Sequence, residues 1–256
     1  CITLIGTFFS FKTYSSVELN EVVVQSELRR ASLFETAASL SILDQQIIEL
    51  REAKHLERLI NLIPNVNFSS GASRGRFFQI RGIGERSQFI QPLNPSVGLL
   101  IDGIDFTGIA GAATMMDLEQ LEVFRGPQGT IYGANALAGL ISLKSKQPTE
   151  NTEGNVLVSA GRFDTSSVAA AVGGSLTDQA SYRLAVLKHE SDGFIENEFL
   201  QRDDTNDIDE QSMRAILKWQ ATDVLTSKIT LFITEVDNGY DAFSLDNTRF
   251  TLSDKP

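Results

Sequence analysis

The sequence has little of what enzymes and cofactor sites are commonly built from. Its single cysteine, Cys1, excludes an intrachain disulfide framework and any metal site held by a cysteine pair. The only histidines, His55 and His189, are far apart, and no serine or carboxylate is placed with either as in a catalytic group. We therefore expect no enzymatic activity, no metal site and no cofactor.

Two further absences limit the partners. The net charge is −11, and the only adjacent cations are Arg29 and Arg30, so the chain would repel a nucleic-acid backbone and a nucleic-acid partner is excluded. No apolar run reaches the roughly 18 residues that a transmembrane helix needs. Any segment that crosses a membrane would have to consist of β-strands.

What is present is the composition of a folded protein, with 42% apolar and 21% charged residues. Residues 1–11 are apolar and are followed by small polar residues. This is typical either of the end of a secretory signal or of an ordinary buried strand, and both alternatives stay open. Residues 1–18 are therefore assigned to a possible signal-peptide remnant or N-terminal extension.

Residues 19–149 have a mixed α and β pattern. Asp44 is placed to cap a short helix that extends to Arg51, and a second helix is expected over residues 53–62, ended by Pro64. The apolar stripe of this region consists of Leu56, Leu59, Ile60 and Ile63. Strands are expected at residues 21–24, 77–81, 97–102, 121–124 and 140–143, and the last two are separated by a glycine-dense segment.

After Pro148 the apolar residues alternate with a period of two. The five alternating or small-residue segments cover residues 156–160, 167–174, 182–187, 212–220 and 228–234. Short connections alternate with a long, acidic one at residues 191–211, as in outer-membrane barrels. A soluble antiparallel sheet would show a similar alternation and stays open on this evidence alone. Five strands cannot close a barrel, so the membrane interpretation requires the chain to be a fragment.

Several motifs resemble the TonB-dependent outer-membrane receptors. Residues 121–133, Leu-Glu-Val-Phe-Arg-Gly-Pro-Gln-Gly-Thr-Ile-Tyr-Gly, are similar to the signature of the receptor plug and continue into the family pattern through Leu143. Residues 62–66, 80–84 and 100–104 are similar to the other plug motifs, in the same order. The resemblance implies an α+β plug domain at residues 19–149, followed at 150–256 by about five antiparallel strands of a transmembrane β-barrel. It also implies a location in the outer membrane of a Gram-negative bacterium.

The chemistry of these motifs is structural. Glycines permit backbone angles and close approaches that a side chain would block, which suits a compact plug. The structural glycines are Gly82, Gly126, Gly129, Gly133 and Gly139. No Gly-Lys-Ser/Thr ending follows them, and the glycines near residue 82 are too sparse for a dinucleotide site.

Arg81 and Arg125 each begin a glycine turn at the end of a strand. In the family, arginines at these positions pair with glutamates of the barrel and help to lock the plug, and the resemblance assigns that role here. The barrel partners would lie beyond Pro256. Exposed turn residues remain the alternative, and Glu122 is an alternative local partner for Arg125.

The resemblance places three loops toward an external ligand, at residues 68–75, 85–95 and 106–114. Their polar and aromatic side chains could bond to or stack on a ligand. The predicted ligand-binding residues are Arg74, Arg76, Arg86, Gln88, Phe89 and Phe106. For any one of them a solvated loop position remains the alternative.

Glu21, Val22, Val23 and Val24 resemble the short segment with which TonB pairs as an added β-strand, although they could equally form the first plug strand. The resemblance implies TonB-dependent uptake of a scarce ligand, most often a ferric siderophore, and otherwise haem, cobalamin or an oligosaccharide. The implied partners are TonB with ExbB–ExbD, outer-membrane lipid and the ligand. The alternatives are a surface receptor or signal transducer without transport, and a soluble adhesin whose strands would have polar outer faces.

Overall fold

The computed structural model describes residues 23–24, 31–32, 38–70, 74–87, 92–198 and 200–240. The chain divides into two compact units, Cys1–Thr36 and Ala37–Pro256. In the first unit, β1 (Val23–Val24) pairs antiparallel with β2 (Ala31–Ser32). Every other element belongs to the second unit.

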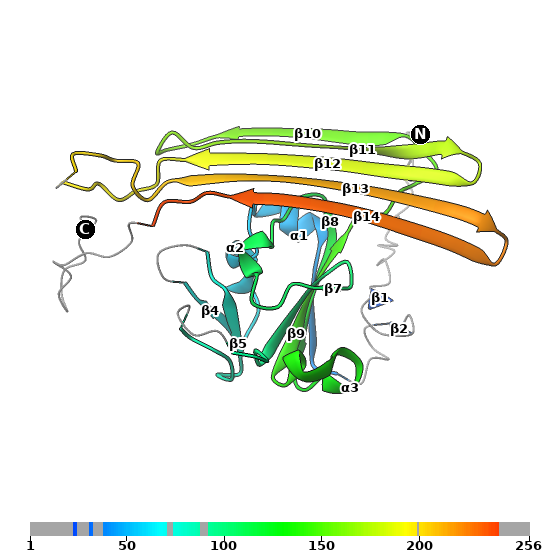
Figure 1. Cartoon of the computed structure of the whole chain (residues 1–256), viewed down its shortest axis with the longest axis horizontal. Helices are drawn as coiled ribbons and strands as arrows, with labels where there is room; N and C mark the ends of the chain where they lie inside the picture. The colour runs from blue at the N-terminus through cyan, green and yellow to red at the C-terminus, as the bar shows by residue number, and fades with distance from the viewer. Residues whose placement is uncertain are drawn as a thin grey trace, which may run out of the picture. The chain divides into compact units, whose positions relative to one another are not determined.

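The first part of the second unit, called the plug below, is built on a five-stranded sheet (Figure 1). The order is β3 (Leu40–Asp44), β8 (Leu118–Arg125), β9 (Gly139–Ser145), β6 (Val97–Ile101) and β7 (Ile104–Asp105). Only the β6–β9 pair is parallel. A separate hairpin joins β4 (Val66–Ser69) to β5 (Phe77–Ile80). All five residues of β6 are buried, as expected for a strand covered on both faces.

The first helix follows the prediction, and the second is shorter than predicted. Helix α1 (Gln45–Leu50) is capped by Asp44, whose side chain accepts a hydrogen bond from the Ile47 amide at 2.9 Å. Helix α2 covers only Glu57–Ile60, because the preceding backbone pairs elsewhere. The Leu56 amide donates to the Ala113 carbonyl, and the Met115 amide donates to the Lys54 carbonyl. The predicted apolar stripe is nevertheless buried in full.

The glycine-dense segment holds two short helices that the sequence did not indicate. Helix α3 covers Gly129–Tyr132, and the 3-10 turn η2 covers Gly133–Ala136; a further 3-10 turn, η1, covers Ala110–Ala112. No helix in the described part of the chain is both long and apolar enough to span a membrane.

Gly139 occupies a position with no room for a side chain. A Cβ atom there would press against the carbonyl oxygen of Phe124 and would lie 2.5 Å from Cδ1 of Ile80. At Gly129, by contrast, a Cβ atom would meet nothing within 4 Å.

We expect Gly139→Ala to lower the free energy of unfolding of the plug by about 1–3 kcal/mol, because the backbone of β8 or β9 must move. Gly129→Ala is the matched control and should lie within about 0.5 kcal/mol of the unchanged protein. Urea unfolding followed by circular dichroism measures both. Equal effects of the two variants would contradict the close approach at Gly139.

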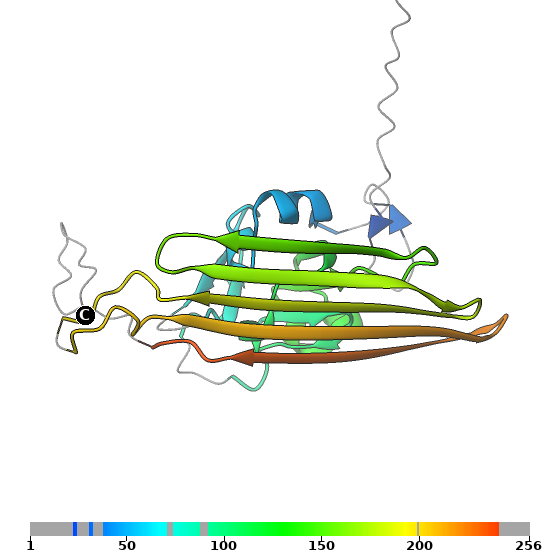
Figure 2. The same cartoon turned by 90° about the horizontal axis from the view of Figure 1, so that it is seen from above.

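The remaining five strands form a second sheet, called the wall below, which lies across the plug (Figure 2). It consists of β10 (Glu153–Ala160), β11 (Ser166–Thr177), β12 (Ala180–Ser191), β13 (Ile208–Thr222) and β14 (Leu225–Val236). Every strand pairs antiparallel with its neighbour in sequence. Residues 178–179 and 223–224 form tight turns at one end, while residues 161–165 and 192–207 form longer connections at the other. The predicted five-strand antiparallel sheet is confirmed.

The two faces of the wall differ in the sense expected for a membrane barrel rather than for a soluble sheet. Large apolar residues are exposed on the face that points away from the plug, as on a lipid-facing surface. They are Val156, Val158, Val168, Val172, Leu184, Val186, Met213, Leu217, Trp219, Ile229, Leu231 and Ile233. Polar and charged side chains are buried on the plug-facing side, where Arg183, Glu210, Ser212 and Arg214 are all less than 7% exposed. The polar outer face that a soluble adhesin would require is absent from these described strands.

Candidate functional site: the interface between plug and wall

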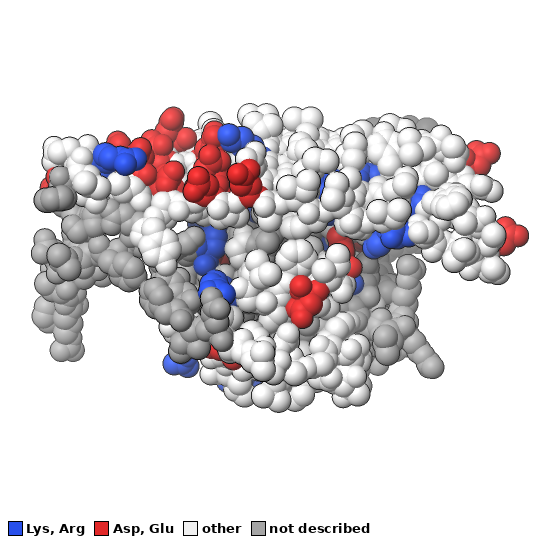
Figure 3. Space-filling view, in the orientation of Figure 1, with Lys and Arg blue, Asp and Glu red and all other residues white. Residues whose placement is uncertain are grey.

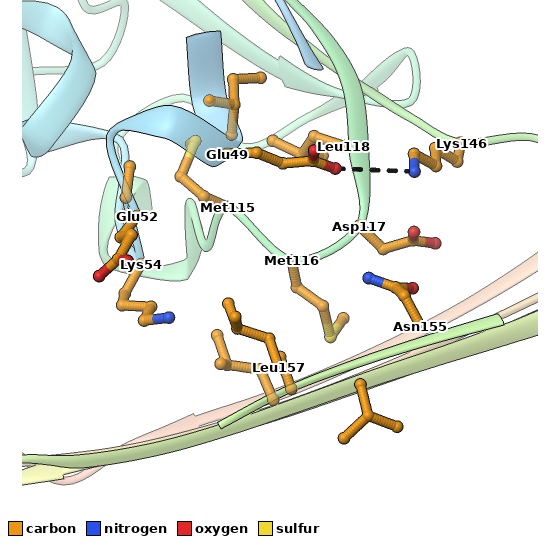
Figure 4. Close-up of a pocket in the computed structure, with 15 residues that line it drawn as sticks. Glu49, Glu52, Lys54, Met115, Met116, Asp117, Leu118, Lys146, Asn155 and Leu157 are labelled. Carbon is orange, nitrogen blue, oxygen red and sulfur yellow. Dashed lines mark ion pairs between the residues drawn. The ribbon is translucent and has the colours of Figure 1, made fainter. Parts of the chain in front are cut away.

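The plug and the wall meet through a small apolar contact. Met116, which precedes β8, packs with Ala171, Ala185 and Leu187 of the wall. Figure 4 shows Met116 extending toward the wall strands beside a cavity of about 370 Å³, with Glu49 and Lys146 3.9 Å apart on its plug side.

Beside Met116, the carboxylate of Asp117 is held by a wall arginine. Nε and Nη2 of Arg183 donate to the two oxygens of Asp117, at 2.5 and 2.7 Å, and Nη1 of Arg183 donates to Glu153 at 2.7 Å. The Asp117 and Arg183 side chains are only 4% and 3% exposed. A two-pronged arginine–carboxylate contact is among the stronger polar contacts, and it fixes orientation as well as distance.

A second wall arginine holds the backbone of the same turn. Nη2 of Arg214 donates to the carbonyl oxygens of Met116 and Asp117, the latter at 3.0 Å. Asp117 has a φ of +51°, a left-handed conformation that aspartate tolerates better than most residues. β12 and β13 therefore bind one plug turn through both its carboxylate and its carbonyl groups. We call this group the Asp117 clamp: Asp117, Arg183, Arg214 and Glu153.

A second ionic contact lies nearer the end of the wall with the longer connections. Nε of Arg74, from the plug, donates to Glu210 of β13 at 2.6 Å, and Nη1 of Arg74 donates to Glu57 at 3.2 Å. Asn238 also donates to the same oxygen of Glu210, at 2.8 Å. Burial alone would lower the pKa of Arg74, but the two glutamates outweigh it and raise the pKa, so Arg74 stays charged. We call this group the Arg74 clamp: Arg74, Glu57 and Glu210.

The buried His55 supports the Arg74 clamp from within the plug. Its Nε2 lies 3.1 Å from the Ala110 carbonyl oxygen, which assigns the proton to Nε2 and leaves Nδ1 to accept from the Glu57 amide at 3.5 Å. Burial, followed by the charge of Arg74, lowers the pKa of His55. His55 is therefore neutral at neutral pH, and the charge of Glu57 is left to pair with Arg74.

The two clamps hold the plug at two heights along the wall. Glu210 lies opposite His189 in the register of β12 and β13, six residues along β12 from Arg183. At about 3.4 Å per residue, the clamps are separated by about 20 Å along the strands. Two separated contacts resist tilting of the plug as well as its displacement.

The structure places all of the predicted lock residues in the plug. Arg81 is exposed at a turn with a φ of +54°. Arg125 donates from Nη1 and Nη2 to the carbonyl oxygens of Pro64 and Leu40, both at 3.4 Å. Glu122 is fully buried and accepts from Gln120 at 2.7 Å. Their role in locking the plug stays a prediction.

Two of the predicted ligand-binding residues contact the wall. Arg74 belongs to the clamp above, and the ring of Phe106 packs edge-on against Phe232 of β14, with centroids 5.7 Å apart. Arg76 donates to the Gly108 carbonyl at 3.3 Å and lies over the Phe77 ring, while Arg86 is exposed. Gln88 and Phe89 lie outside the described residues. Ligand binding by these residues stays a prediction.

The remaining predicted site residues are placed as follows. Val23 and Val24 form β1, while Glu21 and Val22 lie outside the described residues. Among the predicted structural glycines, Gly82, Gly126, Gly133 and Gly139 have positive φ angles. None of the clamp residues Asp117, Arg183, Arg214 and Glu210 was predicted as a site residue from the sequence. For Arg183 and Arg214 the only signal in the sequence was a charged residue in the polar row of an alternating segment, whereas Glu210 was assigned to the long acidic connection at residues 191–211.

The comparison with known proteins agrees with this architecture. Residues 32–140 match the TonB-dependent Receptor Plug Domain. The vitamin B12 transporter BtuB of Vibrio vulnificus strain YJ016 is 25% identical over 226 residues, which cover 85% of this chain and 35% of that protein. The pesticin receptor of Yersinia pestis is 27% identical over 150 residues, which cover 58% of this chain and 22% of that protein. The chain thus spans about a third or less of the length of these relatives.

Solved structures show the same fold. The ferric yersiniabactin uptake receptor FyuA of Yersinia pestis superposes with a TM-score of 0.66 at 22% identity, covering 73% of this chain and 29% of that one. The ferripyoverdine receptor of Pseudomonas aeruginosa superposes with a TM-score of 0.68 at 17% identity, covering 83% of this chain and 27% of that one. Residues 32–140 thus belong to the plug domains of TonB-dependent receptors, and the strands after them form an unclosed run with the barrel fold of these Gram-negative outer-membrane proteins.

Proposed function

We propose that the receptor carrying this chain takes up a scarce ligand across the outer membrane by TonB-dependent active transport. The ligand class best supported by the relatives is a ferric siderophore, followed by cobalamin, with haem and oligosaccharides as further members. The relatives are named as a vitamin B12 transporter, a ferrioxamine receptor and a ferric yersiniabactin uptake receptor. TonB with ExbB–ExbD is the proposed energy source, and outer-membrane lipid is the proposed surrounding of the wall.

The observation that carries this proposal is the way the plug is held. The buried apolar contact between plug and wall at Met116 is small, and ionic clamps at Asp117 and Arg74 join the plug to the wall beside it. Ionic contacts can be exchanged for water when a segment moves, whereas a continuous apolar core would have to be exposed. A plug held in this way can be displaced by an external force and can return.

The proposal is tested by ligand uptake in cells that carry the receptor, with and without functional TonB. Labelled ferric siderophores, cobalamin, haem and oligosaccharides are supplied separately. We expect accumulation of one ligand that disappears when TonB is absent. Ligand binding without any TonB-dependent accumulation would overturn transport and favour a receptor or signal transducer.

A further inference from the structure

A second cavity lies between the plug and the wall at the end with the longer connections. Its volume is about 320 Å³, which lies at the lower end of the range for small-molecule sites. The plug side is formed by Arg51, Glu52, Lys54, His55, Arg58 and Arg74. The wall side is formed by the ends of β10, β12 and β13 and by the connection after β10, through Ser159, Ala160, Gly161, Thr165, His189 and Ile208.

The charge of this cavity is opposite to that of the chain. Its lining contains the cations Arg51, Lys54, Arg58 and Arg74, against the single carboxylate of Glu52, in a protein of net charge −11. Arg74 is already paired with Glu57 and Glu210. Within the described part of the chain, Arg51, Lys54 and Arg58 have no ion-pair partner. Acidic side chains gather instead on the outer rim at this end of the wall (Figure 3).

The cavity continues along the wall into the cavity beside Met116. Both are lined by Glu52 and Lys54. Leu157 of β10 and Leu187 of β12 line the cavity beside Met116, and Ser159 and His189, two residues further along the same strands, line the outer cavity. Residues two apart on a strand lie on the same face, about 7 Å from each other. The two cavities therefore follow one another from the long-connection end toward the middle of the wall, with Lys54 at their junction.

We propose that the outer cavity binds an anionic small molecule, one that carries carboxylate or phosphate groups, through Arg51, Lys54 and Arg58. All three line one cavity and lack a carboxylate partner in the described part of the chain, so an oxyanion in the cavity can accept charged hydrogen bonds from them. Arginine offers a planar fork to such an anion, and lysine offers a compact charge. The site lies on the plug-facing side of the wall, away from the exposed apolar face.

During transport an anionic ligand binds in this cavity first, before it moves past the plug, an assignment that rests on the proposed transport function. The apolar lining of the cavity beyond it, through Met115, Met116 and Leu157, suits the less polar part of such a ligand. Anion binding itself does not depend on transport.

The test is titration of the purified receptor with citrate, and separately with inorganic phosphate, by isothermal calorimetry. The triple variant Arg51→Gln, Lys54→Gln, Arg58→Gln is compared with Arg202→Gln, Lys218→Gln, Lys228→Gln, which removes the same charge from residues outside the cavity. We expect binding of at least one of the two anions, weakened at least tenfold in the cavity variant and changed less than threefold in the control. Circular dichroism tests whether both variants are folded. If the triple cavity variant is unfolded, the single variant Lys54→Gln is compared instead with Lys54→Arg.

The outcomes separate this inference from the proposed function. Equal weakening in both triple variants, or no binding of either anion by the unchanged receptor, overturns the anion site. Cavity-dependent anion binding by a receptor without TonB-dependent uptake supports the site and overturns transport. TonB-dependent uptake by the receptor, together with anion binding that is unchanged in the cavity variant, supports transport and overturns the site.

Discussion

Asp117→Asn is expected to weaken the contact between plug and wall by about 3–5 kcal/mol, because it leaves the buried guanidinium of Arg183 without the carboxylate of Asp117. Arg183 is 3% exposed, and its remaining acidic partner, Glu153, has a half-exposed side chain. Asparagine tolerates the left-handed backbone at this position, so the loss reports the charge and not the turn.

Hydrogen exchange of the β8 and β9 amides measures this effect, since loosening of the plug exposes these strands to solvent. Asp178→Asn, in the exposed turn between β11 and β12, removes the same charge and should change exchange by less than about 0.5 kcal/mol. In the double variant with Arg183→Met, the loss should be smaller than the sum of the single losses, because the uncompensated cation is gone. Additive losses would show that Asp117 and Arg183 do not act as a pair.

The strands of the wall could be predicted from the sequence because they depend on a local rule. Alternation with a period of two fixes which residues share a face, and five segments gave five strands. The rule does not say which face meets the plug. Arg183, Ala185 and Leu187 proved to be the buried row of β12, while the aliphatic Leu184 and Val186 are exposed. A membrane reverses the usual burial of aliphatic residues, and this reversal is visible only with the plug in place.

The clamps could not be predicted because they join residues that are distant in sequence. Asp117 and Arg183 are 66 positions apart, and Arg74 and Glu210 are 136 apart. No spacing relates such pairs, and their contact depends on how the plug is seated against the wall. The length of α2 was overestimated for a similar reason. Backbone hydrogen bonds between residues 54–56 and 113–115 compete with the helix, and the apolar stripe gives no sign of them.

Arg74→Gln is expected to loosen the plug by about 3–5 kcal/mol, because Glu210 is 1% exposed and would lose its cation. Arg86→Gln is the matched control, an exposed plug arginine that the sequence also predicts to bind ligand, and it should stay within about 0.5 kcal/mol. Hydrogen exchange of the plug measures both variants, and ligand affinity is measured in parallel. Weaker ligand binding by Arg74→Gln with an unloosened plug would assign Arg74 to the ligand and not to the clamp.

The weakening of the plug–wall contact in Arg74→Gln should also depend on pH, and the direction of this dependence follows from the pKa of His55. The charge of Arg74 lowers the pKa of His55, whereas Glu57 and Glu210 raise it. Without Arg74 the pKa of His55 rises, and a protonated His55 can partly neutralise the two glutamates. Burial still lowers the pKa of His55 in the variant, but less than burial and Arg74 together do in the unchanged protein. The folded variant therefore takes up a proton more readily as pH falls, and its loss relative to the unchanged protein should be smaller at pH 6 than at pH 8. Glu210 also interacts with His189 of β12, which lies opposite it. Arg74→Gln combined with His55→Gln and His189→Gln should therefore lose this difference, because neither histidine beside the two glutamates then titrates; a difference that persists would place the titrating group elsewhere.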